Sequence, residues 1–141
     1  MRVAVRHVPS LLVALSLSWL LLPALAAPAL AQFGHPLKGT WSGDWGASKD
    51  SRTHVVLEMN WDGKEITGNI NPGPKAVVMK TVTLDPDSWG VHIEGDGKDA
   101  SGQMVHYVID GKLENIGAFQ RILSGTWTEG NKKGDFKVVR N

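Results

Sequence analysis

Residues 53–71, THVVLEMNWDGKEITGNIN, decide the fold, because two runs of alternating apolar and polar side chains flank the pair Asp62-Gly63. Such alternation is typical of β-strands with one buried face and one solvated face. An Asp-Gly pair between two such runs predicts a two-residue type I′ hairpin. Pairing Trp61 with Lys64 then places the apolar residues of both strands on one face, and a shift of one residue would destroy that separation.

The same strand–turn–strand pattern continues along the chain at roughly 8–14-residue spacing, with Gly, Pro, Asp and Asn in the turns. Pairing His92 with His106, and Trp127 with Phe136, again produces one apolar face per hairpin. Successive hairpins of this kind can close into a barrel, which also removes exposed strand edges. The sequence therefore predicts an all-β fold, an eight-stranded antiparallel up-and-down barrel. Its expected strands are Gly39–Trp45, Thr53–Trp61, Lys64–Asn71, Ala76–Leu84, Trp89–Gly95, Gln103–Leu113, Phe119–Thr128 and Asp135–Arg140.

Residues 1–31 have the layout of a secretory signal peptide. Basic residues precede an apolar run over 11–22, and the small-residue motif at 29–31 fits cleavage before Gln32, with a second motif ending at Ala26. The apolar run is short of the roughly 20 residues that span a bilayer. We therefore expect residues 32–141 to form a single β-barrel domain that is periplasmic or secreted, without stable membrane insertion after cleavage.

Composition narrows the classes of function. The chain has no Cys, which excludes disulfides, thiolate zinc sites and a cysteine nucleophile. Its charges nearly balance, whereas nucleic-acid-binding proteins usually carry a basic patch. Common catalytic and phosphate-binding motifs do not occur. We expect no enzymatic activity, no cofactor and no nucleic-acid partner.

Two short segments echo each other, Gly39-Thr40-Trp41 and Gly125-Thr126-Trp127. The first resembles the opening motif of the lipocalin and calycin barrels, and the closing hairpin resembles that of small, functionally uncharacterised exported bacterial barrels. The resemblance implies that Trp41 packs across a closed barrel end with the guanidinium of Arg140 stacked on it. The residues assigned to barrel closure are Gly39, Trp41, Gly125, Trp127 and Arg140. A similarity to avidins in the first two hairpins does not extend to biotin binding.

Aromatic residues are the first candidates for a ligand site. After removal of the signal peptide five Trp remain, which is heavy usage for a domain of this size. Trp45, Trp61 and Trp89, together with Tyr107 on an apolar strand face, could form a stacking surface for a ligand. The alternative is that these rings fill the core and cap the barrel, as large aromatic side chains commonly do.

Two basic residues are the second candidates. Strict alternation places Lys80 on the face of Val82 and Arg121 on the face of Leu123, so both would point into the barrel. Because a buried charge needs a partner, they could hold the anionic head of an amphipathic ligand. The alternatives are that a β-bulge near Met79 turns Lys80 outward and that Arg121 lies at the rim.

The histidines offer a weaker candidate. His92 and Glu94 share a strand face, and the predicted register brings His106 opposite His92. A His/His/Glu cluster can bind a divalent metal. Because this face is opposite the apolar one, we expect a solvated exterior pair and assign no metal site.

These observations favour an exported barrel that binds a small apolar or amphipathic, possibly anionic, molecule in its interior. The predicted ligand-binding residues are Trp45, Trp61, Lys80, Trp89, Tyr107 and Arg121. The alternative is a protein-interaction module with a filled barrel, such as an exported protease inhibitor or an accessory subunit.

Overall fold

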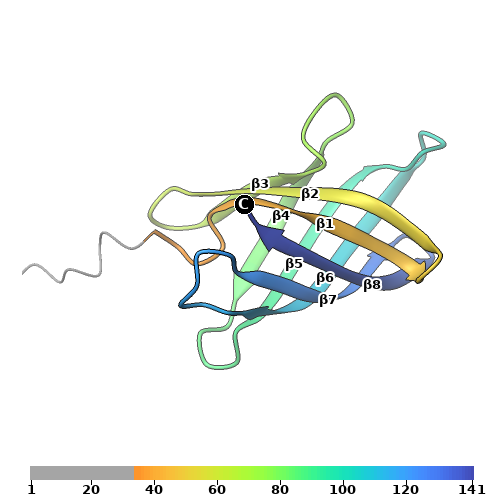
Figure 1. The fold of residues 1–141 in the computed structure, drawn as a ribbon. Coiled ribbons are helices and arrows are strands. Elements are labelled where there is room, and N and C mark those ends of the chain that lie inside the picture. Colours follow the sequence, from red (N-terminus) through yellow and green to blue (C-terminus); the bar gives the residue numbers. More distant parts are fainter. Residues whose placement is uncertain (1–33) are drawn as a thin grey trace, which may run out of the picture. The chain divides into compact units, whose positions relative to one another are not determined.

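A computed structural model describes residues 34–141; the predicted signal peptide lies outside the described residues. The described chain is entirely β-structure and turns (Figure 1). Its strands are β1 (Gly39–Ser48), β2 (Ser51–Trp61), β3 (Ile66–Ile70), β4 (Val77–Leu84), β5 (Gly90–Lys98), β6 (Met104–Glu114), β7 (Ile122–Glu129) and β8 (Lys132–Arg140).

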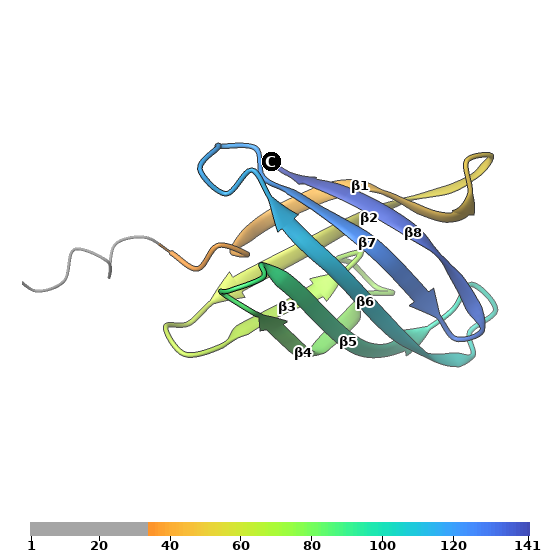
Figure 2. The ribbon, with the colours of Figure 1, turned by 90° about the horizontal axis from the view of Figure 1, so that it is seen from below.

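The strands form one closed antiparallel barrel in sequence order (Figures 1 and 2). Each strand pairs with the next, and β8 returns to β1, where Arg140 lies opposite Trp41. The all-β, eight-stranded, up-and-down architecture predicted from alternation is therefore confirmed, and it is compatible with a lipocalin-like fold. Because neighbouring strands run in opposite directions, the loops alternate between the two ends of the barrel.

Alternating side chains fill the interior, as the period of two requires. Among residues 34–141, eighteen apolar residues are buried, and no polar or charged residue is. The largest fully buried side chains are Trp41, Trp127, Leu37, Leu57, Met59, Ile70, Ile93, Ile109, Leu113, Leu123, Val55 and Val138.

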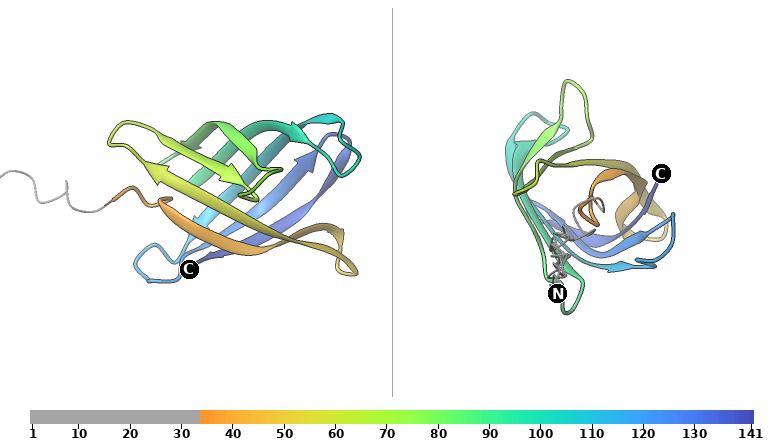
Figure 3. Two further views of the ribbon diagram at one scale, coloured as in Figure 1. Left: turned by 90° about the horizontal axis from the view of Figure 1, so that it is seen from above. Right: turned by 90° about the vertical axis from the view of Figure 1, so that its left-hand side faces the viewer.

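One end of the barrel is closed by the segment that enters β1 (Figure 3). Leu37 is fully buried, and its carbonyl accepts a hydrogen bond of 2.8 Å from the indole N–H of Trp41. Gly39 has a φ of +136°, and a Cβ on it would lie 2.9 Å from Nε of Arg140, so only glycine fits there without strain. Trp41, Gly39 and Arg140 thus meet at this end; stacking of Arg140 on Trp41 stays a prediction.

Trp127 and Gly125 do not take part in this closure. Trp127 lies towards the opposite end of the barrel, where it lines a cavity. Gly125 is needed within the wall, because a Cβ there would lie 2.1 Å from the carbonyl oxygen of Asp110. The repeated Gly-Thr-Trp motif therefore marks two different environments.

The predicted registers are wrong by an even number of residues. Trp61 pairs with Ile66, Gly125 pairs with Phe136, and His92 pairs with Asp110. The first two hairpins are shifted by two residues and the third by four. An even shift leaves every side chain on its predicted face, so the inside and outside of these strands are still as expected.

The turn after Trp61 explains the first shift. Asp62 to Glu65 form a longer loop, in which the Asp62 carboxylate accepts the backbone N–H groups of Glu65 and Lys64 at 2.8 and 2.7 Å. These two bonds, that from Glu65 first, lower the pKa of Asp62. Within the loop only Gly63 has a positive φ, +99°, whereas a type I′ turn needs two such residues. The type I′ assignment is therefore wrong.

The inward orientation predicted for Lys80 is also wrong. The β4–β5 register shifts between Met79 and Thr81, as in a β-bulge, so Val77 and Met79 point inward before it. The extra residue, Lys80, points outward, is 63% exposed and pairs with Asp96. The β-bulge alternative is the one that the structure contains.

Candidate functional site

A cavity of about 630 Å³ opens at the end of the barrel opposite Trp41. The loops that follow β1, β3, β5 and β7 surround it, and its volume is within the range of small-molecule sites. Apolar side chains from five strands form its walls: Trp45, Ile70, Val77, Tyr107 and Trp127. Polar and charged residues form its rim: Ser51, Thr53, Asn71, Lys75, Lys98, Asp99, Glu129, Lys132 and Lys133.

Stacked aromatic rings make one wall rigid. The rings of Trp45 and Trp127 lie 5.2 Å apart between centroids, with planes at 22°. Tyr107 and Phe136 meet Trp127 edge-on, at 6.4 and 6.0 Å. Trp127 is only 1% exposed, while Trp45 is half-buried, so Trp45 offers the accessible indole.

Tyr107 brings a hydroxyl to the boundary between wall and rim. Its O–H donates to Oε1 of Glu129 at 3.3 Å. Burial, and then the nearby negative charge of Glu129, raise the pKa of Tyr107 to about 12. The phenol therefore stays protonated at neutral pH and is a hydrogen-bond donor.

The predicted ligand residues separate into two groups. Trp45 and Tyr107 line the cavity. Trp61 and Trp89 lie at the closed end, where Trp61 packs on His35 with ring centroids 4.8 Å apart and the Trp89 carbonyl accepts the N–H of Leu113. Their predicted place in the ligand lining is therefore wrong.

Neither predicted basic residue reaches this cavity. Lys80 is outside the barrel, for the reason given above. Arg121 is at the closed end, where its guanidinium donates to the carbonyls of Pro36 at 2.8 Å and Ile116 at 3.0 Å. Burial, and then the charge of Arg140, lower the pKa of Arg121. Arg121 therefore holds the segment that precedes β1 against the closed end through hydrogen bonds. The predicted placement of Lys80 and Arg121 around an anion is wrong.

Sequence reasoning missed four lysines at the rim. Lys75 and Lys98 lie in or beside the loops after β3 and β5, and Lys132 and Lys133 begin β8. All four lie outside the predicted strands, in segments expected to be turns, so side-chain alternation was not applied to them. Topology could have found them, because in an up-and-down barrel the first, third, fifth and seventh connections meet at one end.

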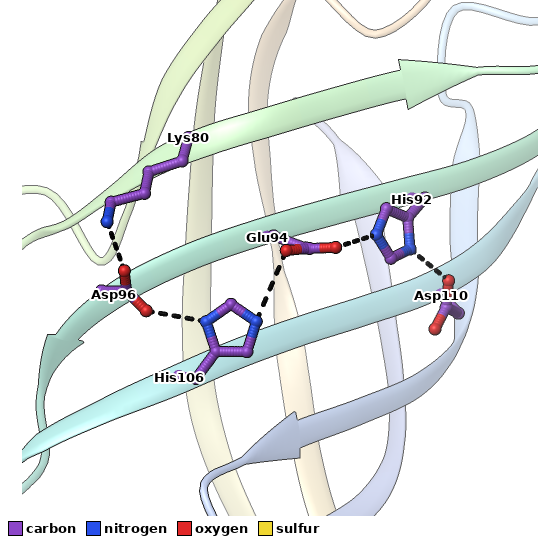
Figure 4. Close-up of polar contacts among 6 residues, drawn as sticks. All are labelled: Lys80, His92, Glu94, Asp96, His106 and Asp110. Carbon is purple, nitrogen blue, oxygen red and sulfur yellow. Dashed lines mark hydrogen bonds and ion pairs between the residues drawn. The ribbon is translucent and has the colours of Figure 1, made fainter.

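The exterior of β4, β5 and β6 carries a chain of charged side chains (Figure 4). Nδ1 of His92 lies 2.6 Å from Asp110, and Nε2 lies 2.7 Å from Glu94. Contact with Asp110, and then with Glu94, raises the pKa of His92. His106 bridges Asp96 and Glu94 at 2.7 and 3.5 Å.

This network lies on the solvated face, as expected, but the predicted His92–His106 pair is wrong, because His106 lies opposite Asp96 and is linked to His92 only through Glu94. Along residues 34–141, no group of three or more His, Asp or Glu side chains is arranged to hold a metal ion. The network therefore contributes ion pairs across neighbouring strands rather than a defined site.

Comparison of the chain with family models, curated proteins and solved structures finds no match. Within the described residues, no helix is long and apolar enough to cross a membrane.

Proposed function

We propose that the protein binds a small apolar or amphipathic molecule in the cavity at the open end of its barrel. The observation that carries the proposal is the joint presence of a cavity of about 630 Å³ and an apolar wall that includes the accessible indole of Trp45. Burial of apolar ligand surface against such a wall contributes roughly 25 cal/mol per Å² before the costs of association.

The same proposal includes export and a lipocalin-like mode of action. The layout of residues 1–31 supports secretion or release into the periplasm, and the Gly39-Thr40-Trp41 motif supports kinship with small exported barrels. Mass measurement of the protein purified from the periplasm or medium tests the cleavage before Gln32. A chain that keeps residues 1–31 would contradict export by cleavage.

Binding of the neutral dye Nile red tests the cavity. We expect its emission to shift to the blue with the wild-type protein, because an apolar wall replaces water around the dye. Trp45→Ala should weaken binding at least about fivefold, from the loss of stacking area. Trp61→Ala is a matched control, since Trp61 is also half-buried but lies at the closed end.

Two results would contradict the proposal. Nile red could fail to bind, or both Trp variants could weaken binding equally, which would place the dye elsewhere. Failure to bind Nile red and other apolar probes would favour the alternative of a protein-interaction module. Capture of a defined secreted protease or enzyme subunit by the purified protein would then support that alternative.

A further inference from the structure

Positive charge is concentrated where the cavity opens. Four lysines and two acidic residues line the cavity, which leaves an excess of two positive charges. By contrast, residues 32–141 as a whole carry 13 Lys and Arg against 14 Asp and Glu. The excess at the cavity is therefore a local feature, which arises because the loop and the strand ends that carry the lysines meet at one end of the barrel.

The two acidic residues at the cavity already have partners. Oδ1 of Asp99 accepts the backbone N–H groups of Ser101 and Gln103 at 2.8 and 3.0 Å, and the Ser101 hydroxyl at 2.6 Å. The hydroxyl of Ser101 is the main reason that the pKa of Asp99 is lowered. Glu129 accepts the hydroxyl of Tyr107. Both carboxylates therefore organise the rim.

The four rim lysines, unlike the two hydrogen-bonded carboxylates, have no ion-pair partner among the described residues. Across residues 34–141, none of Lys75, Lys98, Lys132 and Lys133 forms an ion pair within 4.0 Å. On the barrel exterior, by contrast, Lys80 pairs with Asp96, and Arg52 pairs with Asp44 and Asp135. The rim thus holds exposed ammonium groups without a close ion-pair partner, next to an apolar wall.

We propose that the cavity selects amphipathic organic anions, with the apolar body against the wall and the anionic head among the rim lysines. This inference rests on the proposed function and adds the charge of the ligand to it. The Tyr107 hydroxyl already donates its single hydrogen to Glu129, so the rim lysines alone supply the attraction for the head. A neutral or cationic amphiphile of equal length gains the apolar contact without the attraction.

Decanoate and decanol test this selectivity, because they differ only in the head group. Binding is followed by the intrinsic tryptophan fluorescence, to which Trp45 and Trp127 in the cavity lining contribute, below the concentrations at which the probes aggregate. We expect decanoate to bind about tenfold more tightly than decanol at low salt, because only the carboxylate is attracted by the exposed rim lysines. The preference should shrink as the ionic strength rises, because screening shortens the reach of each charge.

Two four-site variants separate the rim from the overall charge. The rim variant replaces Lys75, Lys98, Lys132 and Lys133 by Gln and should bind decanoate and decanol equally. The control variant replaces Lys38, Lys64, Lys112 and Lys137 by Gln. All eight lysines are exposed, and the four control lysines do not line the cavity, so the net charge changes equally in the two variants.

The outcomes distinguish the inference from the proposed function. Anion selection would be overturned if the wild type bound decanoate and decanol equally, or if both variants lost the preference equally. Neither result would contradict ligand binding in the cavity. Failure of both probes to bind would overturn the function as well. Binding to phosphatidylglycerol vesicles without binding of monomeric decanoate would also overturn the inference, because the lysines would then act on a membrane surface.

Discussion

The two most deeply buried tryptophans differ in one hydrogen bond, and this difference predicts different costs for the same substitution. Trp41 and Trp127 are 0% and 1% exposed. The N–H of Trp41 donates to the Leu37 carbonyl at 2.8 Å, whereas the buried N–H of Trp127 has no partner among the described residues. Replacement by Phe shrinks the ring in both cases and removes a hydrogen bond in only one.

The expected magnitudes follow from these contacts. The smaller ring costs about 1–2 kcal/mol of unfolding free energy in either variant, from lost apolar contact and residual space. Trp41→Phe also leaves the buried Leu37 carbonyl unpaired, which costs about 1–3 kcal/mol more. Trp127→Phe removes an unpaired donor and carries no such penalty. Trp41→Phe should therefore be the more destabilising change by about 1–3 kcal/mol.

Urea unfolding followed by far-UV circular dichroism measures this difference, since the midpoint of each variant is taken between its own folded and unfolded baselines. The midpoint should fall further for Trp41→Phe, with an unchanged slope in both variants. Equal midpoints, or a lower midpoint for Trp127→Phe, would refute the claim that the hydrogen bond from Trp41 to Leu37 stabilises the closed end.

Three further predictions concern the turns, the closed end and the exterior network. Gly63→Ala should cost roughly 1 kcal/mol, because φ is +99° there but the position is open, and a urea midpoint equal to that of the wild type would contradict the loop. Gly39→Ala should cost more than Gly63→Ala in the same assay, because its Cβ would also meet the Arg140 side chain at 2.9 Å. The pKa of His92 is raised in the folded protein by Asp110 and then Glu94, so its stabilising effect is fully present below its unfolded pKa of about 6.5 and is lost as the pH rises through the folded value. His92→Gln should therefore lower the urea midpoint at about pH 5.5 more than at about pH 8.5, and an equal effect at both would show that the network does not contribute through charge.

The predicted faces of most strands and the order in which the strands pair are confirmed, while the residue registers tested in three hairpins are wrong. Side-chain alternation is a local property, so Leu57 and Val91 are assigned to the interior without knowing their partners. Register depends on the number of residues in each turn, and the Asp62 carboxylate lengthens one turn by accepting two backbone N–H groups. The predicted orientation of Lys80 is wrong for a related reason. A single extra residue in β4 reverses the face of the β4 residues that precede it.

The candidate site was predicted less well than the fold. Trp45 and Tyr107 do line the cavity, because they lie on inward faces near strand ends that meet the open rim. Trp61 and Trp89 are tryptophans like Trp45 and have a similar local sequence context, yet they lie at the closed end of the barrel. No local pattern distinguishes the two ends of a strand. Whether a tryptophan packs at the closed end or lines the cavity therefore depends on how the strands assemble.

The amino-acid sequence alone determines that this chain forms alternating strands joined by short turns, because each strand's inward and outward positions are set by its own side chains. The tertiary structure decides which residues from distant segments become neighbours. Closure of the barrel gathers Lys75, Lys98, Lys132 and Lys133 at one rim, although Lys75 and Lys133 are 58 positions apart in the chain. Side-chain periodicity acts within a strand, whereas the site depends on how eight strands tilt and pair around a common axis.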